Sequence, residues 1–360
     1  MVFVLFEGIR FIDPLSSFVF NHLGQAIGYI LVNNIFILVS ILLSLYFSYK
    51  LFSKQFKNTT VIVIFSILFT LSVFNFCRYL AMTPGLYFSW VFPAVIYFMV
   101  CGKHVVVVLL SIFLIYTSTY YWYFSFVLVC FWYLYDFISH HLSLVKLIRN
   151  ILILLVCNVL VIIVFSPNLI ISNTSFNKQY VFSENRLFSS DVVYRPIEDW
   201  YNLSFRPWYF FIPPKSSIFF GDLSKNIYDK IESTGYYLAD DYMEEEMAGS
   251  YMGWHFLLGM AFIAVLLLLK KYKNKEFKTF KTVYENKEMI LRSFFIIFCI
   301  LLISGPPSFT IHGIEIYTPT YLLYYIIPVF RTLVRWAVVI YLFVLIINSF
   351  LVQDLYNLMK

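Results

Sequence analysis

The chain has 360 residues, of which 61% are apolar and 13% charged, and its mean hydropathy is +0.79. This composition leaves too little polar surface to solvate a globule, so it excludes a soluble fold. The net charge of +6 comes from basic residues in short segments between apolar runs, where they orient a chain in a bilayer, so nucleic acid is not expected as a partner.

Apolar runs recur along the sequence and predict an all-α integral membrane fold with about nine transmembrane helices, because backbone polar groups in hydrocarbon must be paired. The expected spans are residues 27–49, 60–82, 86–101, 104–117, 119–138, 149–166, 251–269, 291–304 and 331–352. The expected divisions are an exterior interfacial segment at 1–26, helices 1 to 6 within 27–166, a large exterior loop of mixed or irregular structure at 167–250, and helices 7 to 9 within 251–360.

Lys and Arg predict the orientation, since they concentrate in cytoplasmic loops. Residues 270–292 hold eight basic residues against three Glu, whereas residues 167–250 hold seven basic against twelve acidic residues. We therefore expect a multi-pass protein of the inner or plasma membrane whose large loop is exterior. The N-terminus is then also exterior, although it carries neither a signal peptide nor a span. An N-terminally truncated relative of a longer protein and a short translocated N-terminus both stay open.

The large loop mixes prolines, aromatic rings and both charges in the runs 194–200 and 205–215. Sugars are commonly held by such residues, which makes Arg206 and Trp208 candidate substrate-binding residues. An interfacial aromatic belt is the alternative. The acidic run 240–246 indicates a solvated segment, with divalent-cation binding as the alternative, so no cofactor is certain and a divalent cation stays open.

Ionisable residues beside spans are costly in lipid and are therefore candidate site residues. Arg78 lies late in the second expected span, and Arg331 and Arg335 lie one helical turn apart at the start of the last. These arginines suit a lipid-linked phosphate, and anchoring to headgroups is the alternative. His255 lies near the exterior face and is a further candidate for substrate binding. It lacks a partner at metal-ligand spacing, so no metal ligand is predicted.

A partly apolar stretch is interrupted by prolines at 304–307 and again between Thr318 and Pro328. Irregular backbone survives at membrane depth only when it is buried in protein or lines a watery cavity. We expect a re-entrant element here.

Three stretches, 117–124, 205–214 leading to 251–254, and 305–335, resemble bacterial GT-C-type glycosyltransferases, polytopic membrane enzymes that use polyprenyl-phosphate-linked sugars, and their uncharacterised relatives. The resemblance implies an exterior active site, a lipid-phosphate donor, and an acidic residue in the first exterior loop that acts as base or metal ligand. The chain departs from the family there, because only Glu7 and Asp13 precede the first span. If that loop is absent, the chain is a fragment or an inactive relative.

The leading hypothesis is sugar transfer from a polyprenyl-phosphate donor to a cell-envelope glycan or lipid acceptor. Asp13 or Glu7 would deprotonate the acceptor hydroxyl, while Arg78, Arg331 and Arg335 hold the donor phosphate. A surface-polysaccharide polymerase is the alternative enzyme. A transporter and a noncatalytic multi-span protein are the alternatives from other classes.

Overall fold

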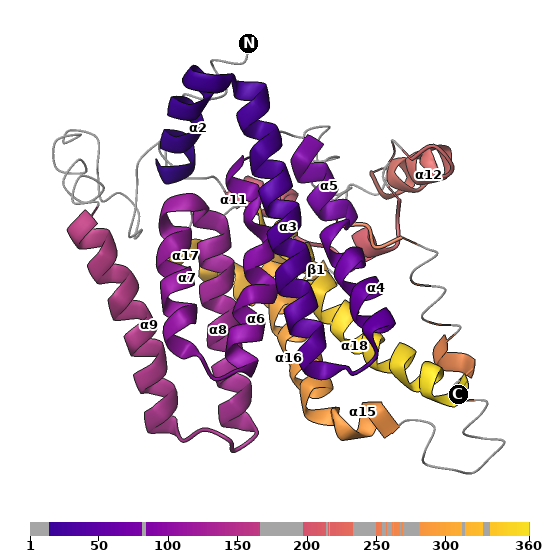
Figure 1. Ribbon diagram of the computed structural model, residues 1–360. Coiled ribbons are helices and arrows are strands. Elements are labelled where there is room, and N and C mark those ends of the chain that lie inside the picture. Colours follow the sequence, from indigo (N-terminus) through magenta and orange to yellow (C-terminus); the bar gives the residue numbers. More distant parts are fainter. Residues whose placement is uncertain are drawn as a thin grey trace. The chain divides into compact units, whose positions relative to one another are not determined.

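The computed structural model in Figure 1 is mostly helical and divides into two compact units. Unit 1 comprises Met1–Pro167, Met260–Ile296 and Leu342–Lys360, and unit 2 comprises Asn168–Gly259 and Ile297–Tyr341. The structure describes residues 14–80, 84–165, 197–213, 215, 217–232, 250–253, 257, 261, 263–266, 268, 281–311, 314–326 and 332–359. The predicted exterior loop thus shares a unit with the predicted broken stretch.

The described helices of unit 1 largely match the predicted spans, except the first and the last of them. They are α2 (Pro14–Ile27), α3 (Tyr29–Gln55), α4 (Thr59–Thr70), α5 (Val73–Leu80), α6 (Val91–Val100), α7 (His104–Thr117), α8 (Thr119–Ile138), α9 (Leu144–Phe165) and α15 (Lys281–Glu285), with 3-10 turns η1 (Pro84–Leu86) and η2 (Phe88–Trp90) before α6. Helices α16 (Lys287–Ser304) and α18 (Ala337–Met359) run across the division between the units. The seventh predicted span, 251–269, is described only in part.

Three helices in the described part of the chain are long and apolar enough to cross a membrane. They are Tyr29–Gln55, Thr119–Ile138 and Leu333–Asn357. The pair Thr59–Thr70 and Val73–Tyr79, bent by 41°, adds a fourth if it is one span. The mostly helical character and the presence of membrane-length apolar helices are confirmed, whereas the count of nine spans stays a prediction.

Helix α2 occupies the segment that was expected to be interfacial, and it packs against α3. Gly28 joins the two helices with a φ of 94°, a left-handed conformation that glycine adopts at little cost. Along α3, the buried Ser40, Ser44 and Ser48 recur every four residues on one face. Their small side chains allow the neighbouring α4 and α6 to approach closely.

The bend between α4 and α5 is stabilised by the buried side chain of Asn75. Its amide donates to the carbonyl oxygens of Phe69 (3.0 Å) and Thr70 (3.3 Å), which lie at the end of α4. A helix break exposes carbonyl groups that need new partners in an apolar setting. Asn75 supplies them, so the sequence itself favours a bent pair over a straight helix.

Helices α7, α8 and α9 are joined by the buried Asn158. Its side-chain oxygen accepts hydrogen bonds from Ser111 Oγ and Trp122 Nε1, each at 2.9 Å, and its amide donates to the Leu154 carbonyl at 2.6 Å. Polar side chains that bond across helices in this way hold apolar bundles together. The stretch 117–124, which carries part of the family resemblance, therefore contributes to helix packing.

Arg292 of α16 joins the end of α8. Its guanidinium donates to Asp136 (2.5 Å) and Glu288 (2.9 Å), and its centre lies 4.3 Å from the Trp132 ring centroid and 5.0 Å from that of Tyr135. Ion pairing and ring contact together stabilise the charge of a side chain that is only 13% exposed.

The described part of unit 2 contains short helices and a hairpin. Its elements are α11 (Ile197–Asn202), η3 (Pro207–Phe210), α12 (Gly221–Glu232), β1 (Ser308–Ile311), β2 (Ile314–Tyr317), α17 (Pro319–Ile326) and η6 (Leu333–Trp336). A small core forms where Trp200, Tyr324 and Leu333 pack together with Ile197 and Leu323.

The hairpin departs from the all-α expectation. Strands β1 and β2 are antiparallel, with Ser308 opposite Tyr317 and Thr310 opposite Glu315. Pro306 and Pro307 lie just beyond the end of α16 and cannot donate the hydrogen bonds that would continue it. The β-branched and aromatic residues that follow favour strands. The predicted broken stretch is therefore a hairpin followed by a short helix.

Candidate functional site: a pocket in unit 2

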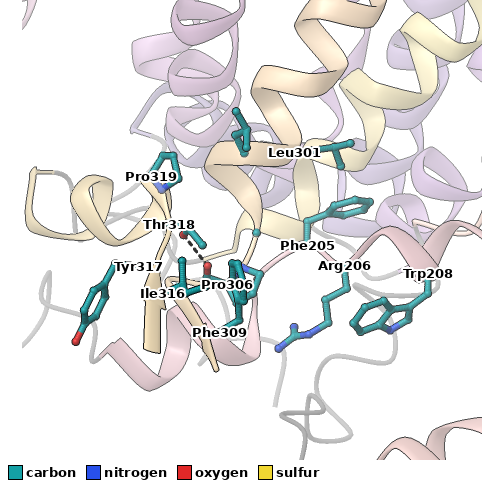
Figure 2. A pocket seen from close by; sticks show the side chains of 12 residues that line it. Phe205, Arg206, Trp208, Leu301, Pro306, Phe309, Ile316, Tyr317, Thr318 and Pro319 are labelled. Atoms are coloured by element: carbon teal, nitrogen blue, oxygen red, sulfur yellow. Dashed lines mark hydrogen bonds between the residues drawn. The ribbon is translucent and has the colours of Figure 1, made fainter. Parts of the chain in front are cut away.

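A pocket of about 450 Å³ lies in unit 2, between two segments that are distant in sequence, 205–208 and 301–319. Figure 2 shows the residues that line it: Phe205, Arg206, Trp208, Leu301, Leu302, Gly305, Pro306, Phe309, Ile316, Tyr317, Thr318 and Pro319. The walls are mostly apolar and aromatic, and Arg206 is their charged member. This size and lining are typical of sites for small amphipathic ligands.

Hydrogen bonds to backbone carbonyls fix the parts of the pocket wall to one another. The Phe205 N–H donates to the Ser304 carbonyl at 2.7 Å. Thr318 donates its hydroxyl to the Pro306 carbonyl at 2.7 Å, the dashed line in Figure 2, and its N–H to the Pro307 carbonyl at 2.9 Å. Because these bonds hold carbonyl groups at the end of α16 and just beyond it, the pocket walls keep their positions without a continuous helix or sheet.

Arg206 lines the pocket and is held in place by backbone carbonyls. Its side chain is only 1% exposed. The guanidinium donates to the carbonyl oxygens of Tyr201 (2.9 Å) and Ser204 (3.2 Å), and its weakest bond reaches the Tyr209 hydroxyl (3.5 Å). A buried guanidinium is stabilised by several acceptors in fixed directions. Arg206 thus sets the path of residues 201–206 and places positive charge beside the pocket.

A polar network lies on the hairpin at the edge of the pocket. The carboxylate of Glu315 accepts hydrogen bonds from Ser308 Oγ at 2.6 Å and from the Tyr317 hydroxyl at 2.9 Å. Tyr201 and Ser308 share a further hydrogen bond between their hydroxyls. The bond from Ser308, followed by that from Tyr317, lowers the pKa of Glu315, so this exposed carboxylate is ionised at neutral pH.

Of the four predicted site residues that the structure describes, it brings two together in the pocket, Arg206 and Trp208. Arg78 lies in unit 1, where it is 2% exposed and its guanidinium centre is 5.1 Å from the Phe74 ring centroid. A phosphate could reach Arg78 only if that side chain moved. Arg335 lies half-buried in η6.

Four predicted site residues lie outside the described residues: Glu7, Asp13, His255 and Arg331. The acidic run 240–246 lies outside them as well. Within the described part of the chain, no group of three or more His, Cys, Asp and Glu side chains could hold a metal ion.

The sequence analysis did not single out Glu315 or the tyrosines that follow it. The sequence did contain a signal for the tyrosines. Tyr317, Tyr321 and Tyr325 recur every four residues, a spacing that places residues on one side of a helix. The role of Ser308 depends on strand register, which brings it opposite Tyr317 and has no local sequence signal.

Comparison with protein-family models, curated proteins and solved structures finds no match for this chain.

Proposed function

We propose that the chain is a multi-pass membrane glycosyltransferase of the GT-C type that transfers a sugar from a polyprenyl-phosphate donor to a cell-envelope glycan or lipid acceptor. The observation that carries the proposal is the pocket in unit 2. It unites segments 205–208 and 301–319, and both contain motifs on which the family resemblance rests. Membrane-length apolar helices support the use of a lipid-linked donor.

The lining of the pocket fits this chemistry. Phe205, Trp208 and Phe309 offer aromatic faces for the apolar side of a sugar, and Leu301 and Leu302 offer a surface for an isoprenoid chain. The positive charge of Arg206 favours an anionic phosphate nearby, although its hydrogen bonds to carbonyls assign it a positioning role. In the proposed reaction, Asp13 or Glu7 removes the proton of the acceptor hydroxyl, whose oxygen then bonds to the sugar carbon as the polyprenyl phosphate leaves.

The complete topology belongs to this proposal: nine spans, a cytoplasmic basic loop at 270–292, and unit 2 on the exterior face. Reconstituted protein and a radiolabelled polyprenyl-phosphate sugar test the activity. We expect label in an acceptor product, and we expect the double variant Glu7→Gln/Asp13→Asn to lose it. Full activity in the double variant would remove the catalytic assignment.

The same assay separates the alternatives. Label in a growing polymer made from lipid-linked oligosaccharide units would favour the polysaccharide polymerase. Exchange of substrate across the membrane without any new product would favour a transporter.

A further inference from the structure

A stripe of three tyrosines continues from the pocket edge along α17. The ring centroids of Tyr317 and Tyr321 are 4.4 Å apart, and those of Tyr321 and Tyr325 are 5.0 Å apart. The hydroxyls of Tyr321 and Tyr325 share a hydrogen bond of 2.9 Å. Tyr317 is 55% exposed and Tyr325 is 37% exposed, so the stripe presents ring faces and hydroxyls at the surface.

The stripe is attached to both the pocket and the polar network. Tyr317 lines the pocket, and Figure 2 shows its ring directed away from Arg206 and Trp208. Its hydroxyl donates to the ionised carboxylate of Glu315, which therefore lies at one end of the stripe. A ligand that leaves the pocket on this side would meet aromatic rings and a carboxylate in succession.

Exposed tyrosines at a membrane protein surface can also anchor it in the lipid interface. The carboxylate argues against insertion of this stripe, because an ionised group is costly in hydrocarbon. The hydrogen bonds from Ser308 and Tyr317 stabilise the charged form and so oppose neutralisation. This end of the stripe therefore favours an aqueous setting.

We propose that Glu315, Tyr317, Tyr321 and Tyr325 form a binding platform for a neutral, linear oligosaccharide. The apolar faces of successive pyranose rings lie on the tyrosine rings, and sugar hydroxyls donate to the Glu315 carboxylate and bond with the tyrosine hydroxyls. The negative charge of the Glu315 carboxylate disfavours the binding of acidic glycans. The platform deepens the proposed transferase by giving the glycan acceptor a place beside the pocket, and in that sense it rests on the proposed function.

Direct binding to the full chain in lipid nanodiscs tests the platform. The probes are chitotetraose, cellotetraose and maltotetraose, with tetragalacturonate as the acidic counterpart, and saturation-transfer NMR measures binding. We expect at least one neutral probe to bind more tightly than the acidic one. Tyr321→Ala should weaken that binding about tenfold, which corresponds to about 1.4 kcal/mol. Tyr321→Phe keeps the ring and should lose less.

Leu322→Ala is the matched control, because Leu322 lies on the same helix, is 63% exposed and does not line the pocket. It should bind the probe as the natural chain does. Tyr325→Ala gives a second test if Tyr321→Ala does not fold. The proposal is overturned if no neutral probe binds, or if folded tyrosine variants bind as well as the control. Hydroxyl-radical footprinting that finds Tyr321 and Tyr325 covered by lipid would also overturn it.

Measurements of glycan binding and of sugar transfer distinguish failure of the platform from failure of the proposed transferase. Glycan binding without any transfer would leave the platform standing and remove the transferase. Transfer that is unaffected in Tyr321→Ala, together with no measurable glycan binding, would remove the platform alone.

Discussion

Two arginines, the partly buried Arg292 and the buried Arg206, show how differently units 1 and 2 use the same side chain. In unit 1, Arg292 pairs with Asp136 and Glu288 and lies against Trp132 and Tyr135, so its charge is neutralised within a helix packing contact. In unit 2, Arg206 donates to backbone carbonyls and lines a pocket. The first arrangement joins helices, whereas the second shapes a loop around a space that a ligand can enter.

Removal of Arg206 should give the largest loss of stability. Arg206→Ala would leave the carbonyls of Tyr201 and Ser204 without their guanidinium donor, which costs on the order of 3 kcal/mol. Arg206→Lys should recover little, because an ammonium lacks the planar fork. Thermal unfolding in detergent, with limited proteolysis at residues 201–210, measures the effect. Equal protease resistance in the natural chain and in Arg206→Ala would contradict the loop-shaping role.

Removal of Arg292 should cost on the order of 2 kcal/mol, because Asp136 and Glu288 would lose their charge partner in a partly buried site. A double-mutant cycle with Asp136→Asn should give a coupling energy of about 1 kcal/mol or more. Lys287→Ala is the control. Lys287 lies on the same helix, and the ring that its ammonium contacts, that of Tyr284, is exposed. Additive effects of the Arg292 and Asp136 changes would show that this pair does not join α16 to α8.

Asn158→Ala should cost about 1 kcal/mol, the magnitude typical of a polar contact between membrane helices. Trp122→Phe removes one of its partners and should cost less, because Ser111 can still donate to the Asn158 oxygen. Unfolding of the two single variants and of the double variant measures these differences. If Trp122→Phe lost more stability than Asn158→Ala, packing of the Trp122 ring would contribute more to stability than the hydrogen bonds of Asn158.

The smallest effect concerns the hairpin and pH. The pKa of Glu315 is lowered in the folded chain, so its contribution is present above the ordinary glutamate pKa and is lost as pH falls through the folded value. Intrinsic amide exchange slows between pH 6 and about pH 3, and exchange in residues 308–317 should therefore slow less than intrinsic chemistry predicts. Glu315→Gln should remove this extra dependence. If exchange in both chains departs from the intrinsic rate by the same amount, the effect belongs to another group.

The helices were largely predictable from sequence because a single strong constraint, pairing of backbone groups in apolar surroundings, acts along each run. The end of α16 could also be placed from Pro306 and Pro307. The hairpin could not, since strands as short as β1 and β2 resemble the end of an interrupted span. The extra helix α2 was missed because its amphipathic segment is too short to stand out as a span.

The pocket was predictable only in part. Arg206 and Trp208 stood out by their proline-aromatic context, yet nothing local indicates that Leu301, Ile316 and Thr318 form the facing wall. That arrangement depends on hydrogen bonds between distant segments, such as the one from Phe205 to Ser304. Residue type therefore indicated the chemistry of the site, and the tertiary fold determined its location.

The most direct test of the account fills the pocket and measures sugar transfer. Leu302→Trp places a bulky ring in the pocket wall, and Leu291→Trp places the same ring on the same helix at an exposed position that does not line it. In proteoliposomes with a radiolabelled polyprenyl-phosphate sugar, we expect the natural chain and Leu291→Trp to form product equally. Leu302→Trp should lose at least about tenfold in rate, equivalent to about 1.4 kcal/mol. Equal rates in all three chains, or no product from the natural chain, would contradict the account.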